Sequence, residues 1–155
     1  MALLQEGQVA PSFTAKNQDG KEIKLSNFKG KKVILYFYPK DNTPGCTAEA
    51  CNLRDNYDAL LEKGFEVIGV SPDNEKSHTN FISKYSLPFN LIADTDKEIL
   101  KAYGAWGEKK MYGKTYEGVL RTTYVIDEEG KIEKVIEKVK TKDHASQVLE
   151  SLGMN

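Results

Sequence analysis

Cysteine and arginine are both scarce in this chain of 155 residues, and each scarcity narrows what the protein can be. The two cysteines, Cys46 and Cys51, are too few for a disulfide-stapled scaffold, which a chain of this size does not need. The two arginines, Arg54 and Arg121, stand among 20 lysines, so a site that needs a guanidinium has only two candidates. The two thiols therefore either have no special role or take part in a reaction that the protein carries out.

Strong net charge and long apolar runs are missing as well. The formal net charge of −1 gives no electrostatic reason to expect nucleic acid or an anionic membrane as a partner. The longest apolar run, residues 33–38, is far shorter than the about 20 residues of a membrane span, and the start of the chain does not resemble a signal peptide. We expect a cytoplasmic protein, in which a close pair of cysteines is more often catalytic or redox-sensing than structural.

The remaining composition predicts one α/β domain over residues 1–155, because 39% apolar residues suffice for a core and the length suits a single domain. The patterns predict strands at 13–17, 21–25, 32–38, 65–71, 89–93, 122–127 and 131–138, and helices at 46–63, 74–85 (capped by Asp73), 96–103 and 142–152. Residues 104–118 form a glycine- and aromatic-rich excursion. This order predicts a thioredoxin-like fold: a central mixed sheet with helices on both faces and an N-terminal hairpin extension.

Cys46 lies where the predicted buried strand has ended, a Pro- and Gly-rich loop has turned, and a helix begins. The free N–H groups and the positive dipole end of a helix N-terminus stabilise a thiolate, which is the nucleophilic form. Position alone also allows a small buried hydrophobe on an apolar helix face. Both interpretations remain open at this point.

Cys51 follows Cys46 by five residues on the same predicted helix. That spacing puts the Cα atoms roughly 8–9 Å apart, whereas a disulfide needs them within about 7 Å. A bond between the two sulfurs therefore requires the first part of the helix to unwind.

The two histidines offer little support for metal or hydrolase chemistry. Cys-x4-Cys with His78 and His144 far downstream is not a zinc-binding spacing. We interpret both histidines as solvated surface residues, so neither supplies the base of a cysteine hydrolase. Activation of a thiol then falls to the helix terminus or to a cation, for which Arg121 is the candidate.

The segment 38–47 contains Pro39, Thr43 and Cys46 in the pattern Pro-x-x-x-Thr-x-x-Cys, which resembles the active-site signature of the peroxiredoxins. The continuation 47–55, with its second cysteine, is similar to the peroxiredoxin Q branch, also called bacterioferritin comigratory protein. Segments 7–13, 103–114 and 121–127 add to the resemblance, which runs over nearly the whole chain in the right order.

The resemblance implies a thiol peroxidase without metal or other cofactor. Cys46 would be the peroxidatic residue and attack hydrogen peroxide or an organic hydroperoxide, and Cys51 the resolving residue that forms an intramolecular Cys46–Cys51 disulfide. A thioredoxin-type reductant would then clear the disulfide, and the chain would act as a monomer.

Further residues take supporting roles in the same resemblance. Arg121 would hold the thiolate and polarise the peroxide, Thr43 would hydrogen-bond both, and Pro39 would shield the pocket. Glu49 either orients Arg121 or lies on a solvated helix face. Two other activities on the same fold stay open: a thiol-disulfide oxidoreductase, although that class usually has Cys-x-x-Cys, and a peroxide sensor.

Overall fold

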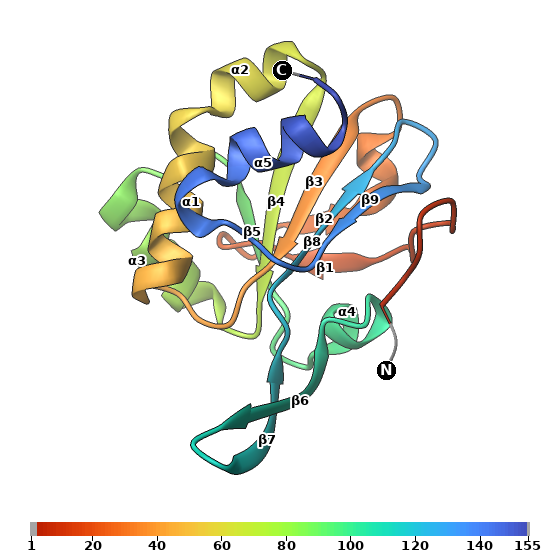
Figure 1. Cartoon of the computed structure of the whole chain (residues 1–155). Helices are drawn as coiled ribbons and strands as arrows, with labels where there is room; N and C mark the ends of the chain where they lie inside the picture. Colours follow the sequence, from red (N-terminus) through yellow and green to blue (C-terminus); the bar gives the residue numbers. More distant parts are fainter. Residues whose placement is uncertain (1–2, 155) are drawn as a thin grey trace.

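The computed structural model describes residues 3–154 and is built on a five-stranded sheet (Figure 1). Its strand order is β5-β4-β3-β8-β9, with bounds Asn90–Ala93, Phe65–Ser71, Lys32–Phe37, Thr122–Ile126 and Ile132–Ile136. β3 is parallel to β4 and antiparallel to β8. The predicted mixed central sheet is therefore confirmed.

β3 forms the centre of the molecule because its β-branched and aromatic run is buried on both faces. Ile34 and Tyr36 face one hydrophobic cluster, while Leu35 and Phe37 face another, as the two-residue period of a strand requires. The first cluster is covered by α1 Pro44–Asp55, α2 Tyr57–Glu62, α3 Glu75–Tyr85 and α5 His144–Ser151. The second is covered by α4 Glu98–Ala102 and the 3-10 turn Leu25–Phe28.

The long helix predicted at 46–63 is in fact two helices. α1 ends at Asp55 and α2 begins at Tyr57, because Asn56 leaves the helical region with φ −107° and ψ 6°. α1 also begins two residues earlier than predicted, with Pro44 in its first turn, where the missing N–H of proline costs nothing.

The prediction that Asp73 caps α3 is wrong. Asn74 holds the N-cap position, and its side chain accepts a hydrogen bond from the N–H of Ser77 at 2.8 Å. Asp73 instead accepts from the N–H of Asp41, which ties the loop after β3 to the loop after β4. The last predicted helix begins as a 3-10 turn, Thr141–Asp143, before α5.

Two hairpins flank the sheet. The predicted N-terminal one is confirmed as β1 Thr14–Lys16 and β2 Glu22–Lys24. Residues 104–118, predicted only as an excursion, contain β6 Trp106–Met111 and β7 Lys114–Val119, which project from the body (Figure 1). The turn between them, Tyr112-Gly113, has positive φ at both residues, as a type I′ hairpin turn requires.

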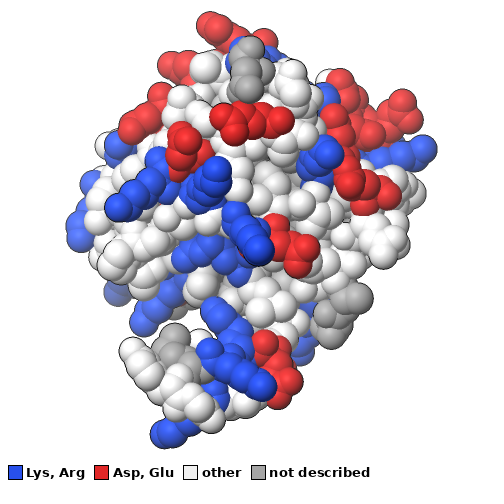
Figure 2. All heavy atoms as spheres, in the orientation of Figure 1, with Lys and Arg blue, Asp and Glu red and all other residues white. Residues whose placement is uncertain are grey.

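Surface charges of both signs are interleaved, in keeping with the net charge (Figure 2). Lysines extend onto the projecting hairpin, where Lys109, Lys110 and Lys114 lie in or beside the strands. Among residues 3–154, no helix has the length and apolar character needed to cross a membrane.

Candidate active site

Cys46 is the third residue of α1 and is almost completely buried, with 1% of its surface exposed. The N-cap residue Thr43 does not cap the helix with its side chain, since its hydroxyl donates to the carbonyl oxygen of Lys40 at 2.8 Å. The first helical hydrogen bond here is made by the N–H of Thr47 to the carbonyl of Thr43. The N–H groups of Gly45 and Cys46, just before Thr47 in the first turn, are thus left to serve a ligand.

Arg121 reaches Cys46 because of the register of the central strands. β8 pairs with β3 so that Thr122 lies opposite Phe37, which puts the preceding residue beside the loop that leads into α1. There Nη2 of Arg121 donates to Sγ of Cys46 at 3.2 Å, and Nη1 donates to Oε1 of Glu49 at 2.8 Å. One planar guanidinium therefore bridges a thiol and a carboxyl.

Gly45 makes room for this guanidinium. A Cβ atom at position 45 would lie 3.3 Å from Nη2 of Arg121, which is closer than nearly all such contacts in proteins. The glycine before Cys46 therefore permits the close approach of Arg121 to the helix.

Glu49 is fully buried one turn after Cys46, so the alternative of a solvated helix face is wrong. Burial raises the pKa of the Glu49 carboxyl from 4.5 to about 7, although Arg121 acts in the opposite direction. Burial lowers the pKa of Arg121, but the charges of Cys46 and Glu49 outweigh it, so that pKa is raised. The guanidinium is held as a cation between two groups that can each become anionic.

The other predicted site residues lie on the same segment. Pro39 is partly buried at the start of the loop between β3 and α1, and Thr43 is partly exposed at its end. Cys51 is partly exposed on α1, and both thiols are free. Because α1 is continuous from Pro44 to Asp55, helical geometry holds the two Cα atoms roughly 8–9 Å apart.

Both histidines are completely buried, which contradicts the prediction that they are solvated. His144 opens α5, with its Nε2 atom 2.8 Å from Oγ1 of Thr123 and 3.5 Å from Oε2 of Glu49. The sequence carried a signal for this: His144 and Val148 are four residues apart, and Val148 lies on the apolar face of the helix. His144 therefore adjoins the group that holds Arg121.

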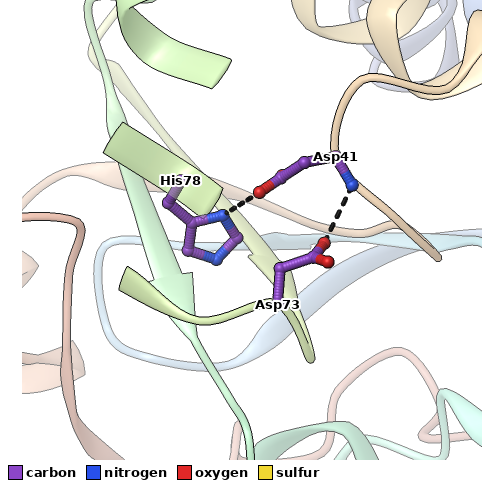
Figure 3. A group of neighbouring side chains, drawn as sticks. All are labelled: Asp41, Asp73 and His78. Atoms are coloured by element: carbon purple, nitrogen blue, oxygen red, sulfur yellow. Dashed lines mark hydrogen bonds and ion pairs between the residues drawn. The ribbon is translucent and has the colours of Figure 1, made fainter. Parts of the chain in front are cut away.

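His78 belongs to a separate cluster with Asp41 and Asp73 (Figure 3). Its Nε2 donates to the carbonyl oxygen of Ile92 at 2.9 Å, and its Nδ1 lies 2.7 Å from Oδ2 of Asp41. Asp41 also accepts from the hydroxyls of Tyr38, at 2.6 Å, and of Ser77, at 2.7 Å.

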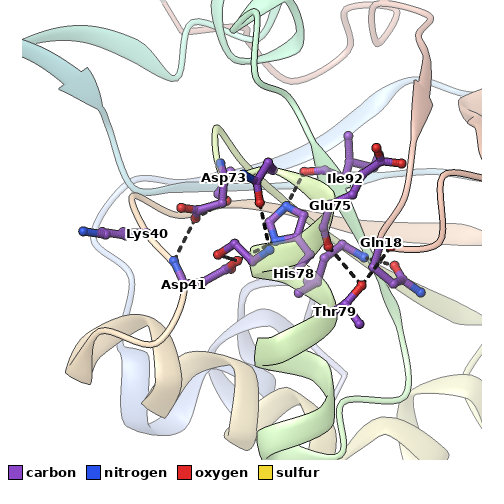
Figure 4. A network of polar contacts seen from close by, with 12 residues as sticks. Gln18, Lys40, Asp41, Asp73, Glu75, His78, Thr79 and Ile92 are labelled. Atoms are coloured by element: carbon purple, nitrogen blue, oxygen red, sulfur yellow. Dashed lines mark hydrogen bonds and ion pairs between the residues drawn. The ribbon is translucent and has the colours of Figure 1, made fainter.

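His78 and the two aspartates have ligand atoms within 4.8 Å of one another, and these atoms already take part in hydrogen bonds within the protein. Both nitrogens of His78 and both carboxylate oxygens of Asp41 are already used in hydrogen bonds. The cluster ties the loop before Cys46 to α3, which is tied to the N-terminal hairpin through Thr79 and Gln18 (Figure 4).

Comparison with known proteins identifies the family of this chain. The family model described as the AhpC/TSA family matches residues 7–135. Peroxiredoxin Bcp of Bacillus subtilis is 45% identical over 149 residues, covering 96% of this chain and 95% of that protein. Peroxiredoxin Bcp of Escherichia coli is 44% identical over 146 residues, covering 94% of each.

A solved structure shows the same fold. The bacterioferritin comigratory protein of Xanthomonas campestris, studied for its alkyl peroxide reduction activity, superimposes with a TM-score of 0.88 and 33% identity over 96% of this chain and 98% of that one. Because the family model covers most of the chain and the relatives match nearly all of it, the chain belongs to the peroxiredoxin family, in its Q or Bcp branch, and is a thiol peroxidase.

Proposed function

We propose that this thiol peroxidase uses Cys46 as its peroxidatic residue and Cys51 as its resolving residue. The observation that carries the proposal is the 3.2 Å contact between Nη2 of Arg121 and Sγ of Cys46 at the first turn of α1. A guanidinium and a helix N-terminus both favour the thiolate over the thiol. Among the described residues, no guanidinium contacts Cys51. We therefore assign Cys51 to the second step, in which it attacks the oxidised Cys46.

In the first step the Cys46 thiolate attacks one peroxide oxygen and the O–O bond breaks. The sulfur is oxidised to a sulfenic acid, and the leaving oxygen takes a proton to become water or an alcohol. Arg121 and the N–H groups of Gly45 and Cys46 stabilise the negative charge that moves from sulfur to the leaving oxygen. Thr43 supplies a hydroxyl oxygen that can accept from the peroxide, and Pro39 shields the pocket.

In the second step the Cys51 thiol attacks the sulfenic sulfur of Cys46, which forms the disulfide and releases water. Since an intact α1 keeps the two residues too far apart, its first turns unwind for this step. A thioredoxin-type dithiol then reduces the disulfide and becomes oxidised itself.

The proposed substrates and oligomeric state follow from this chemistry. The substrates are hydrogen peroxide and organic hydroperoxides, in line with the alkyl peroxide activity of the Xanthomonas campestris relative. An intramolecular resolving cysteine makes a second subunit unnecessary, so we propose a cytoplasmic monomer with one domain over residues 1–155. It needs no metal, nucleic acid or membrane partner.

Peroxide consumption driven by thioredoxin, thioredoxin reductase and NADPH tests the proposal. Cys46→Ser is expected to abolish turnover. Cys51→Ser should still consume one equivalent of peroxide and accumulate a sulfenic acid that a dione reagent traps. Full activity of Cys46→Ser would overturn the assignment, and disulfide reductase activity without peroxide turnover would favour an oxidoreductase. Replacing thioredoxin by glutathione in a parallel assay tests the class of reductant.

A further inference from the structure

His144 is a buried titratable residue that the proposed peroxidase cycle does not use. It lies at the start of α5, and its Nε2 atom faces Oε2 of Glu49 at 3.5 Å. The other oxygen of that carboxyl accepts from Arg121. Within residues 3–154, Oε2 of Glu49 is one of two buried side-chain oxygens without a hydrogen-bond partner. Buried polar atoms rarely lack a partner, so this one needs an explanation.

The neighbours of His144 fix which of its nitrogens carries the proton. Oε1 of Gln147 accepts from the backbone N–H of Lys140 at 2.8 Å, and Nε2 of Gln147 donates to the carbonyl of Lys138 at 2.8 Å. The amide orientation is thereby set, and its oxygen lies 2.9 Å from Nδ1 of His144. Nδ1 must be the donor in that contact. In the neutral ring, Nε2 is then bare and accepts from the hydroxyl of Thr123.

A bare Nε2 opposite an ionised Glu49 would set two electron-rich atoms against each other in a buried place. One proton between Oε2 and Nε2 removes the conflict. Burial keeps that proton on the carboxyl, since it raises the pKa of Glu49 to about 7 and, as the largest cause, lowers the pKa of His144 to about 4. With Glu49 neutral, the charge of Arg121 is left for the Cys46 thiolate.

We propose that His144 is a positioning residue of the peroxidase: its Nε2 atom sets the orientation and protonation of Glu49, and so the charge that Arg121 presents to Cys46. The proposal rests on the assignment of Cys46 above. The groups that face the pair are Arg121 before β8, Cys46 on α1 and the buried Tyr36 of β3. Lys142 and Asp143, next to His144, are exposed.

Two substitutions at His144 should both let Glu49 ionise at lower pH than in the wild type, by different amounts. In His144→Gln the amide N–H can donate to Oε2, which favours the carboxylate, so Glu49 should ionise at lower pH than in the wild type. In His144→Phe the acceptor for the carboxyl proton is lost and no donor replaces it, so Glu49 should ionise at a pH between those of the wild type and His144→Gln. Infrared difference spectra against Glu49→Gln report the protonated carboxyl directly, without any activity measurement.

The rate constant for oxidation of reduced enzyme by hydrogen peroxide, followed from pH 5 to 9, gives the second readout. His144→Gln should react roughly tenfold more slowly than the wild type at pH 6, because an ionised Glu49 takes a share of the charge that Arg121 otherwise presents to the Cys46 thiolate. The step in the pH profile that arises from the ionisation of Glu49 should shift together with the midpoint of that ionisation measured by infrared spectroscopy. The step should be absent in Glu49→Gln.

Val148→Ala is the matched control, because Val148 is buried on α5 and packs in the first hydrophobic cluster. It should lower thermal stability and leave the midpoint and the pH profile unchanged. Identical midpoints in the wild type, His144→Gln and His144→Phe would overturn the role of His144. If Cys46→Ser still reduced peroxide, the assignment of Cys46 would fail instead.

Discussion

Arg121 is the residue on which the site's geometry depends, because its two terminal nitrogens hold two different partners. Nη2 contacts Sγ of Cys46 and Nη1 contacts Oε1 of Glu49. A lysine would keep the charge but could not hold both partners in one plane. Arg121→Lys should therefore lower kcat/KM for peroxide by about 10²-fold, the cost of one well-placed donor to a developing charge.

The chain supplies its own control, since Arg54 is the other arginine. It pairs with the exposed Asp55 and donates to the carbonyl of Tyr85, away from Cys46. Arg54→Lys is expected to retain nearly the full kcat/KM for peroxide when both variants are measured by stopped flow. Equal losses in the two variants would mean that charge or stability, not the position of Arg121, governs the rate.

Glu49 and His144 should give opposite contributions to stability as pH changes. The pKa of Glu49 rises to about 7 on folding, so its contribution is full below pH 4.5 and is lost as pH rises through 7. The pKa of His144 falls to about 4, so its contribution is full above pH 6.5 and is lost as pH falls through 4. Each amounts to about 3 kcal/mol at most, and the two slopes oppose each other between pH 4.5 and 6.5.

Urea unfolding over pH 4–8 checks these signs. Relative to the wild type, Glu49→Gln should gain stability as pH rises from 4.5 to 7. His144→Gln should gain relative stability as pH falls from 6.5 to 4. Comparison with the wild type cancels the contributions of other carboxyls, such as Asp94, whose pKa burial also raises. Curves that run parallel to the wild type would show that the two groups titrate alike in the folded and unfolded states.

At the scale of elements, α1 has two requirements that conflict. It must be intact to present Cys46 to Arg121, and it must unwind for Cys46 and Cys51 to bond. Oxidation with one equivalent of peroxide should therefore increase amide hydrogen exchange across residues 44–53, while α3 keeps its protection. Exchange-mass spectrometry of the reduced and oxidised protein measures this, and Cys51→Ser is the control that cannot form the bond.

The side chain of Asn52 shows how far such unwinding would extend. Its Oδ1 accepts from the N–H of Ala145 at 2.8 Å, and its Nδ2 donates to the carbonyl of Lys142 at 3.1 Å. It thus supplies the N-terminus of α5 with a cap from another helix. In the same experiment exchange near Ala145 should rise together with that of α1. Unchanged protection in both segments would rule out local unfolding as the route to the disulfide.

Periodicity and turn residues were sufficient to predict the sheet, the helices on both of its faces and the position of Cys46 at the start of a helix, because these features depend on local patterns. The burial of His78 was not predicted, since it depends on Asp41, which lies far along the chain. The burial of His144 was missed although its spacing to Val148 indicated it, and its partners Glu49 and Thr123 are also distant in sequence. The break at Asn56 was missed for a similar reason. Its neighbour Tyr57 is held by a hydrogen bond to Glu66 on β4, which no helical period encodes.

For the whole molecule, formation of the Cys46–Cys51 disulfide is expected to lower the free energy of unfolding. Closing a loop of about six residues stabilises by about 2 kcal/mol in the chain-entropy model. Against this, unwinding α1 exposes Cys46 and Ala50, both buried in the first hydrophobic cluster, and separates Glu49 from Arg121. The hydrogen bond from the charged Arg121 contributes about 1.5–3 kcal/mol, and together with the lost apolar burial it outweighs the gain.

The oxidised protein should therefore melt several degrees below the reduced one, because about 1 kcal/mol moves the Tm of a domain of this size by about 2–4 °C. Calorimetry of wild type with and without one equivalent of peroxide measures the difference, and Cys51→Ser should show no such shift. A fold that is less stable when oxidised returns to its intact α1 on reduction without any other input, since only the disulfide holds α1 open. An oxidised form that melts higher than the reduced form would mean that α1 repacks around the bond, and local unfolding would then be transient rather than maintained.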